Sequence, residues 1–232
     1  MGYRMMTIAE RIAQIQQVIA TTAESCQRSP HEIELLAVSK GQPTNAIAEA
    51  VAAGICHIGE NYWQEAKTKM RALTHLPICW HFIGPIQSNK TQEIAQAFSW
   101  VHSVSREKIA RLLAQHRPAH LPALNVCLQV NLDEEETKSG LLPQQVHELA
   151  LIAHQLPRLK LRGLMTIPKP QLGEQQQYES LLRLTNLFNQ LNQELGLNLD
   201  TLSMGMTEDL VAAIRAGSTM VRIGRAIFGE RR

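Results

Sequence analysis

The feature that most limits the possible folds is a regular alternation of short apolar runs with longer polar segments of helical character. Eight such runs, each of five to eight residues, occur between residues 35 and 224. Their enrichment in Val, Ile, Leu and aromatic residues is typical of strands that are buried on both faces. The runs are Leu35–Ser39, Ile55–Gly59, Trp80–Gly84, Trp100–Val104, Leu124–Asn131, Leu161–Ile167, Thr201–Gly205 and Met220–Gly224.

The segments between the runs have the pattern of one-faced helices. Several place apolar residues at positions i, i+3, i+4 and i+7. The segment TNAIAEAVAAG begins with a polar cap and ends at Gly54, which is a helix C-terminal signal. A further amphipathic helix is predicted over residues 8–22, before the first run. No linker long enough to divide the chain is visible, so residues 1–232 are predicted to form a single domain.

Strands that alternate with helices form a parallel sheet with helical crossovers. The count of eight, the length of 232 residues and the short connections favour a closed (β/α)8 TIM barrel over an open doubly wound sheet. No GxGxxG motif follows the first run, which disfavours a dinucleotide-binding sheet. In such barrels the active site lies at the C-terminal ends of the strands. Functional residues are therefore expected directly after each run.

Charge and composition exclude several classes of partner. The net charge is +2, and no block of like charges suggests nucleic acid as the main partner. No apolar run approaches the ~20 residues that span a membrane, and the N-terminus lacks a secretory signal, so a cytoplasmic protein is expected. The four cysteines are far apart and form no CxxC pair, which predicts buried free thiols in a reducing compartment and no metal site.

Lys40 directly follows the first run, in the stretch LLAVSK. Lysine is rarely buried without a partner, so one alternative is that Lys40 simply turns into solvent where the strand meets its loop. The other is an amine held partly desolvated at the barrel mouth. Desolvation favours the neutral form, which can attack an aldehyde and form a Schiff base.

Two glycine-containing turns follow the last two runs, in SMGMTEDL (residues 203–210) and VRIGRAIFG (residues 221–229). Loops at this place in a barrel frequently bind phosphate, because glycine lets the backbone approach a ligand closely. The alternative is a pair of tight turns with Thr207 as a helix N-cap and Glu208 and Asp209 in the first helical turn. A lysine amine that can react with an aldehyde, together with a phosphate site in the same barrel mouth, predicts pyridoxal 5′-phosphate (PLP) as the ligand.

Arg222 would then face the pyridine nitrogen of the cofactor. A guanidinium stays charged and keeps that nitrogen unprotonated, which weakens the ring as an electron sink. The alternative role of Arg222 is a salt bridge inside the barrel.

Seven ordered motifs identify a resemblance to a known family. AVSK, GENYWQE, WHFIGPIQSNK, KSG, GLMTI, SMGMTEDL and VRIGRAIFG resemble those of the pyridoxal phosphate homeostasis proteins (the YggS/PROSC family). The resemblance implies an alanine-racemase-type barrel of PLP fold type III, with Lys40 as the Schiff-base lysine and Asn61 beside the cofactor. By the same resemblance Arg222 lies at the ring nitrogen, and the phosphate turns contain Ser203, Met204, Gly205, Gly224 and Arg225.

For four residues the sequence allows two roles, one at the cofactor site and one unrelated to it. Arg225 stands where the family often has a small hydroxyl residue, so its side chain could help to bind phosphate or face solvent. Met165 could fill the barrel or form a wall against the cofactor ring. His81 is expected to be a hydrogen-bonded core histidine rather than a ligand contact. Lys138 matches a family lysine, and a solvated surface position is expected for it.

The resemblance implies a protein of intracellular PLP homeostasis and amino-acid balance that could pass PLP to apoenzymes. A racemase of this fold needs a second base, supplied in alanine racemases by a tyrosine from a C-terminal domain. The chain ends soon after the eighth run, and only Tyr62 of its three tyrosines lies near a strand end. We therefore expect a monomeric carrier without turnover. The alternatives are a PLP-dependent racemase or lyase, and a sugar-phosphate isomerase-like barrel without PLP.

Overall fold

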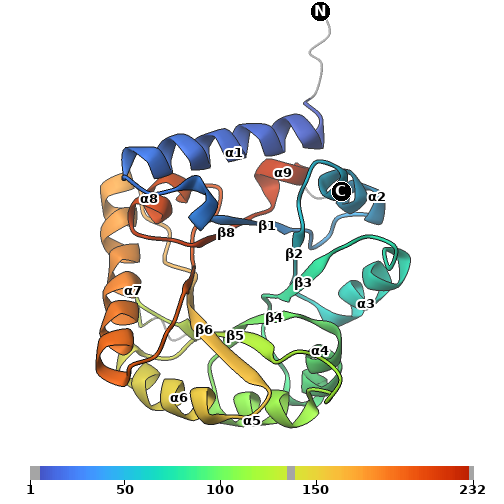
Figure 1. Ribbon diagram of the computed structural model, residues 1–232. Coiled ribbons are helices and arrows are strands. Elements are labelled where there is room, and N and C mark those ends of the chain that lie inside the picture. Colours follow the sequence, from blue (N-terminus) through green and yellow to red (C-terminus); the bar gives the residue numbers. More distant parts are fainter. Residues whose placement is uncertain (1–5, 135–138, 230–232) are drawn as a thin grey trace, which may run out of the picture.

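The computed structural model, which describes residues 6–134 and 139–229, is a closed parallel barrel (Figure 1). Each strand pairs with the next in sequence, and the last strand pairs with the first. The predicted TIM barrel is therefore confirmed, and all eight strands lie within about two residues of their expected bounds. The strands are β1 (Glu34–Val38), β2 (His57–Glu60), β3 (Cys79–Phe82), β4 (Trp100–Val104), β5 (Leu124–Val130), β6 (Leu159–Thr166), β7 (Thr201–Ser203) and β8 (Met220–Ile223).

The helices surround this barrel (Figure 1). The predicted N-terminal helix is present and extends three residues beyond its expected end. It begins with a capping box in which the Thr7 hydroxyl accepts the Glu10 amide and the Glu10 carboxylate accepts the Thr7 amide. The helices are α1 (Ile8–Ser25), α2 (Thr44–Ala52), α3 (Trp63–Ala72), α4 (Thr91–Ala97), α5 (Glu107–His116), α6 (Pro143–Gln155), α7 (Glu174–Leu195), α8 (Leu210–Arg215) and α9 (Arg225–Phe228). Within residues 6–134 and 139–229, none of the helices combines the length and the hydrophobicity of a membrane span.

Two separate sets of apolar side chains stabilise the barrel. Alternate strand residues, such as Ala37, Ile58 and Val221, belong to the large core between the strands and the helices. A smaller cluster of Trp100, Cys127 and Met165 is distinct from that core. Successive strand residues point to opposite faces of a sheet, so these two clusters occupy the outside and the inside of the barrel.

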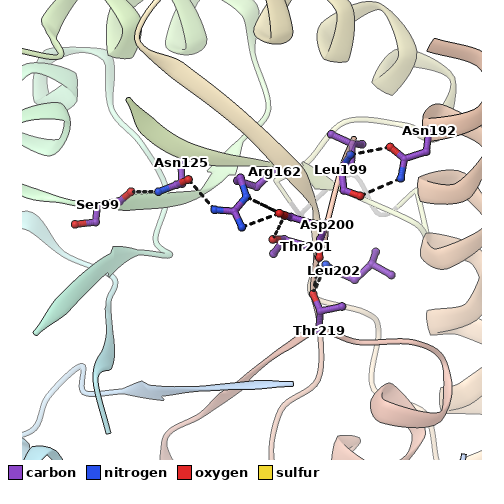
Figure 2. Close-up of polar contacts among 9 residues, drawn as sticks. All are labelled: Ser99, Asn125, Arg162, Asn192, Leu199, Asp200, Thr201, Leu202 and Thr219. Carbon is purple, nitrogen blue, oxygen red and sulfur yellow. Dashed lines mark hydrogen bonds and ion pairs between the residues drawn. The ribbon is translucent and has the colours of Figure 1, made fainter. Parts of the chain in front are cut away.

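A polar network ties together the N-terminal ends of several strands, as Figure 2 shows. The Arg162 guanidinium donates two hydrogen bonds of 2.8 Å to the Asp200 carboxylate and one of 2.9 Å to the Asn125 amide oxygen. Asn125 in turn donates to the Ser99 carbonyl over 3.1 Å. The same guanidinium lies 4.6 Å from the centre of the Trp100 ring, a cation–π contact. This network closes the end of the barrel opposite to the expected site.

The cysteines are all free, as predicted, but their burial differs. Cys127 is fully buried inside the barrel, and this burial raises the pKa of its thiol to about 12. Cys26 and Cys79 are partly buried. The expectation that Cys56 is buried is wrong, because this residue precedes β2 on the exposed N-terminal rim of the barrel.

Gly163 gives a test of the strand packing. A Cβ atom at this position would lie 1.8 Å from the Thr201 carbonyl oxygen on the neighbouring strand. We expect Gly163→Ala to lower the free energy of unfolding by roughly 1–3 kcal/mol or more, as overpacking does. Urea denaturation would measure this change. The control is Gly173→Ala, where no atom lies within 4 Å of the new Cβ, and an equal loss in both variants would contradict the packing argument.

Candidate functional site

A cavity of about 430 Å³ opens at the C-terminal end of the barrel. Five of the nine residues predicted to bind the cofactor line it, from the ends of β1, β2 and β8. They are Lys40, Asn61, Arg222, Gly224 and Arg225. Residues that are far apart in sequence therefore meet in one cavity, at the place that a (β/α)8 barrel uses for function.

Lys40 continues the inward-facing side of β1. Val38, two residues earlier, lines the same cavity, and Leu36 is fully buried outside the helix-facing core. Because alternate strand residues share a face, the position that follows Val38 on the inside is Lys40. The chain then turns at Gly41, whose φ of 73° suits glycine. Of the two alternatives for Lys40, the structure supports the half-buried lysine that lines the cavity.

A buried ion pair fixes the backbone next to Lys40. The Lys69 ammonium donates to the Ser39 carbonyl and to the Glu60 carboxylate, both over 2.6 Å. The Ser39 hydroxyl donates to the same carboxylate, and Glu65 also accepts from Lys69. Burial raises the pKa of the Glu60 carboxyl, although the hydrogen bonds from Lys69 and Ser39 act in the opposite direction. Sequence reasoning missed this cluster; its one visible signal is the i, i+4 spacing of Glu65 and Lys69 on α3.

Asn61 presents a buried polar atom to the cavity. Its Oδ1 has no hydrogen-bond partner among the described residues. The alternative role of Asn61 as a helix cap is not observed, because Tyr62 is the N-cap of α3. The Asn61 backbone lies against Gly84, where a Cβ would be 1.9 Å from the Asn61 carbonyl oxygen. A buried amide without a partner is costly, so this position is suited to a ligand that supplies the missing hydrogen bond.

Arg222 is buried at the base of the cavity, and three hydrogen bonds hold its guanidinium in place. Its Nη1 donates to the Ser203 carbonyl over 2.6 Å and to the Ser203 hydroxyl over 2.9 Å, and its Nη2 donates to the Thr166 carbonyl over 2.8 Å. Burial lowers the pKa of Arg222 to about 10, against the opposing effect of the Asp209 carboxylate. The guanidinium is therefore charged at neutral pH. The hydrogen bonds of its guanidinium within the described part of the chain go to carbonyl and hydroxyl oxygens and not to a carboxylate, so the salt-bridge alternative is not supported.

The turns after β7 and β8 form one side of the cavity. Gly205 has a φ of 101°, and a Cβ there would meet the Ala213 side chain at 2.6 Å. The helix α8 begins only at Leu210, with Asp209 as its N-cap, so the alternative that made Thr207 the N-cap is wrong. Thr207 instead lines the cavity. The Asp209 carboxylate accepts the Met206 amide over 2.6 Å, which closes this turn on itself.

Arg225 and Glu208 form an ion pair across these two turns. Both side chains line the cavity, and both are more than half exposed. An exposed pair of this kind contributes about 0–1 kcal/mol to stability. The Arg225 guanidinium is therefore available to exchange Glu208 for an anionic ligand at little energetic cost.

The other predicted site residues lie outside the cavity lining. Ser203 and Gly205 lie directly below it and bond to Arg222, whose amide donates to the Gly205 carbonyl over 2.9 Å. Met204 is fully buried in the helix-facing core, and Met165 is fully buried against Trp100 and Cys127. Of its two interpretations, Met165 thus fills the barrel. Lys138 lies outside the described residues.

A chain of three histidines runs through the barrel interior away from the cavity. The Ser203 hydroxyl lies 2.8 Å from His102 Nδ1, and His102 Nε2 lies 2.9 Å from His81 Nδ1. His81 Nε2 lies 2.8 Å from His57 Nδ1, and His57 Nε2 lies 3.4 Å from a carboxylate oxygen of Glu34 at the N-terminal rim. His81 is therefore a hydrogen-bonded core histidine, as predicted.

The two ends of this chain set the direction of its hydrogen bonds. Arginine can only donate, so the Ser203 oxygen accepts from Arg222 and its proton is left for His102. At the other end the Glu34 carboxylate can only accept. Each histidine consequently accepts at Nδ1 and donates at Nε2, and the two fully buried rings, His81 and His102, are neutral. Burial lowers the pKa of His102 to about 3 and that of His81 well below its usual value, which agrees with neutral rings.

Comparison with known proteins shows the family to which the chain belongs. Its barrel and lysine-bearing cavity define an alanine-racemase-type barrel protein, and the family profile of the alanine racemase N-terminal domain matches residues 12–232. A pyridoxal phosphate homeostasis protein of Pseudomonas aeruginosa is 54% identical over 98% of this chain and 97% of its own length. The Escherichia coli K12 protein of the same name is 48% identical, with 98% of both chains covered. The chain belongs to the family of pyridoxal phosphate homeostasis proteins.

Solved structures agree with this assignment. PipY of Synechococcus elongatus PCC7942, solved without PLP and with PLP bound, is 35% identical, and 96% of this chain covers 100% of PipY. The TM-scores are 0.86 and 0.85. Alanine racemase from Corynebacterium glutamicum, at 15% identity and a TM-score of 0.69, shares the fold over 61% of its own chain.

The buried ion pair near Lys40 gives a stability prediction. Lys69→Met leaves the Glu60 carboxylate buried without its cation, and breaking such a pair costs about 3–5 kcal/mol of unfolding free energy. The double variant Lys69→Met/Glu60→Met should recover most of that loss. Urea denaturation would measure both. The control is Arg111→Met, which removes an exposed i, i+4 pair with Glu107 and should cost less than about 1 kcal/mol; a similar loss at both sites would refute the buried-pair argument.

The neutral histidines predict acid sensitivity. In the unfolded chain each binds a proton near pH 6.5, whereas in the folded protein the pKa of His102 is about 3 and that of His81 is also lowered. Below about pH 6.5 the unfolded chain therefore binds protons at these two rings that the folded protein does not bind. The free energy of unfolding is highest above about pH 6.5 and falls as the pH falls. We expect a loss of about 1.4 kcal/mol per pH unit from His102 between pH 6 and 4, and a further loss in the same direction from His81.

Urea denaturation at several pH values would measure this slope. His102→Gln should lower the slope by about 1.4 kcal/mol per pH unit, which corresponds to one proton. His154→Gln, a change at an exposed position, should leave the slope as in the wild type. Equal slopes in the wild type and His102→Gln would show that the buried ring takes up no proton on unfolding.

Proposed function

We propose that this protein binds PLP in the C-terminal cavity and holds it as a Schiff base on Lys40. In that reaction the Lys40 nitrogen bonds to the aldehyde carbon, and the aldehyde oxygen leaves as water. The observation that carries the proposal is the convergence of Lys40, Asn61 and Arg222 on one cavity of about 430 Å³. The names of the relatives and the PipY structure with PLP bound support the same ligand.

The residues present fit the chemical groups of PLP. The Lys40 amine is suited to the aldehyde, and the Asn61 amide has a buried oxygen that needs a partner. For the phosphate we propose the turns that contain Gly205 and Gly224, where glycine lets the backbone come close, with Arg225 exchanging Glu208 for the anion. Ser203 and Met204 would hold the first turn in place, because the Ser203 carbonyl accepts from Arg222 and the Met204 amide donates to the Met220 carbonyl.

Arg222 argues for storage of the cofactor rather than for catalysis. PLP supplies an aldehyde and an electron-accepting ring when it is bound. Arg222 is charged, buried and held by Ser203 and Thr166, so it would donate a hydrogen bond to the ring nitrogen without giving up its proton. An unprotonated ring nitrogen is a weak electron sink. Among the described residues no tyrosine or histidine lines the cavity to act as a second base.

We therefore propose a role in PLP homeostasis, in which the protein keeps the reactive aldehyde bound and releases it to apoenzymes that need it, with an effect on amino-acid balance. The cavity supports exchange, because one wall consists of surface turns and an exposed ion pair. We propose further that it acts in the cytoplasm as a monomer, which size-exclusion chromatography with light scattering would test.

Borohydride reduction tests the attachment point. Protein loaded with PLP should absorb visible light, and after reduction mass spectrometry should find the cofactor on the peptide that contains Lys40. Lys40→Ala should lose both signals, since the amine is gone, whereas Lys108→Ala at an exposed position should keep them. Attachment to another lysine would contradict the Schiff-base proposal, and protein that stays colourless with added PLP would favour a barrel that binds only a sugar phosphate.

Turnover separates a carrier from an enzyme. Glu208 lines the same cavity as Lys40 and is the carboxylate that a racemase or lyase could use there. We expect no conversion when the loaded protein is incubated with single-enantiomer amino acids. Racemisation or cleavage that is abolished by Lys40→Ala would replace the carrier proposal with a catalytic one.

A further inference from the structure

A cluster of nitrogen and sulfur ligands lies at the end of the barrel opposite to Lys40. His57 of β2 is paired in register with Cys79 of β3, and His81 follows two residues later on the same face of β3. One ligand atom of each residue lies within 4.8 Å of the others. The sequence predicted no metal site because these residues are not clustered along the chain; the parallel pairing of β2 and β3 brings them together.

We propose that His57, Cys79 and His81 bind a transition-metal ion of borderline softness, one that accepts both nitrogen and sulfur ligands, such as Zn²⁺. Two imidazoles and one thiolate are a ligand set that suits Zn²⁺, and three protein ligands leave the fourth tetrahedral position open. This site is independent of the proposed PLP site, which uses none of these residues.

The two ring nitrogens already face one another. His57 Nδ1 and His81 Nε2 are 2.8 Å apart and share one proton. With metal–nitrogen bonds of about 2.0–2.1 Å and tetrahedral angles, the same nitrogens would be about 3.4 Å apart. A shift of roughly half an ångström therefore opens room for the ion. The side chain of His57 is partly exposed, so its ring has freedom to make this movement.

Both ligand rings have an acceptor for their other nitrogen. His57 Nε2 faces the Glu34 carboxylate at 3.4 Å, and His81 Nδ1 faces His102 Nε2 at 2.9 Å. Metal-binding histidines almost always donate their second N–H to such a partner, which fixes the tautomer and the ring orientation. On binding, the His81 proton would move from Nε2 to Nδ1, and the His102 proton would likewise move to Nδ1, so neither ring loses a proton. The Ser203 hydroxyl would keep its proton and rotate, so that its oxygen accepts from His102 Nδ1. The Cys79 thiol would release one proton to solvent.

A hollow of about 470 Å³ at the N-terminal rim gives access to the cluster. Glu34 and His57 line it, together with Cys56 and His31, which do not belong to the cluster. An ion can enter from this side without passing the PLP cavity, and the open coordination position can be filled by water. Cys56 and His31 offer matched controls, because they have the same ligand chemistry in the same hollow.

Titration with Co²⁺ and competition with Zn²⁺ test the site in the full-length protein. We expect one ion per chain, with a thiolate-to-cobalt absorption band that Cys79→Ser abolishes. His57→Gln should weaken binding at least tenfold, and Glu34→Gln, which removes an outer acceptor at an exposed side chain, roughly tenfold. Cys56→Ser and His31→Gln should bind as the wild type does. Circular dichroism would confirm that each variant is folded.

Two results would overturn the proposal. One is wild-type protein that takes up no stoichiometric ion, and the other is binding that survives in both Cys79→Ser and His57→Gln. Lys40→Ala should bind the metal normally, so failure of the PLP proposal would leave this result unchanged.

Discussion

The pairing of β8 with β1 is the constraint on which the rest of the structure depends. It closes eight parallel strands into a ring, so their alternate side chains converge on a common interior and their C-terminal ends on a common mouth. Lys40 and Arg222 are 182 positions apart in sequence and line one cavity because their strands are neighbours across this closure. An open sheet would place these two residues on opposite edges.

Closure also creates a narrow interior in which every polar group must find a partner. For many of these groups the partners form one line of donors and acceptors, which runs from Arg222 through Ser203 and the three histidines to Glu34, whereas Asn61 Oδ1 at the mouth is left without a partner within the described ranges of the chain. The direction of the line is fixed by a pure donor at one end and a pure acceptor at the other. One polar line thus joins the cavity proposed for PLP to the cluster proposed for a metal.

Much of the site could be predicted because local position decided it. Lys40 and Asn61 each follow a strand that the apolar pattern reveals, Arg222 lies near the end of another, and a barrel presents such positions at its mouth. Met204 was harder, because it lies next to the mouth in sequence but points into the helix-facing core. The buried ion pair of Lys69 was missed because its partners Ser39 and Glu60 come from other parts of the chain, whose distance from Lys69 is known only after folding.

By itself the sequence determined the number of strands, their order and the residues at their ends, since hydrophobic periodicity and turn residues act over short distances. Only the tertiary structure decided which side chains share a cavity, which polar groups are neutral and where a ligand set such as His57, Cys79 and His81 forms. The physical reason is that burial and hydrogen bonding are properties of neighbours in space, and in a parallel barrel those neighbours come from strands separated by a whole helix.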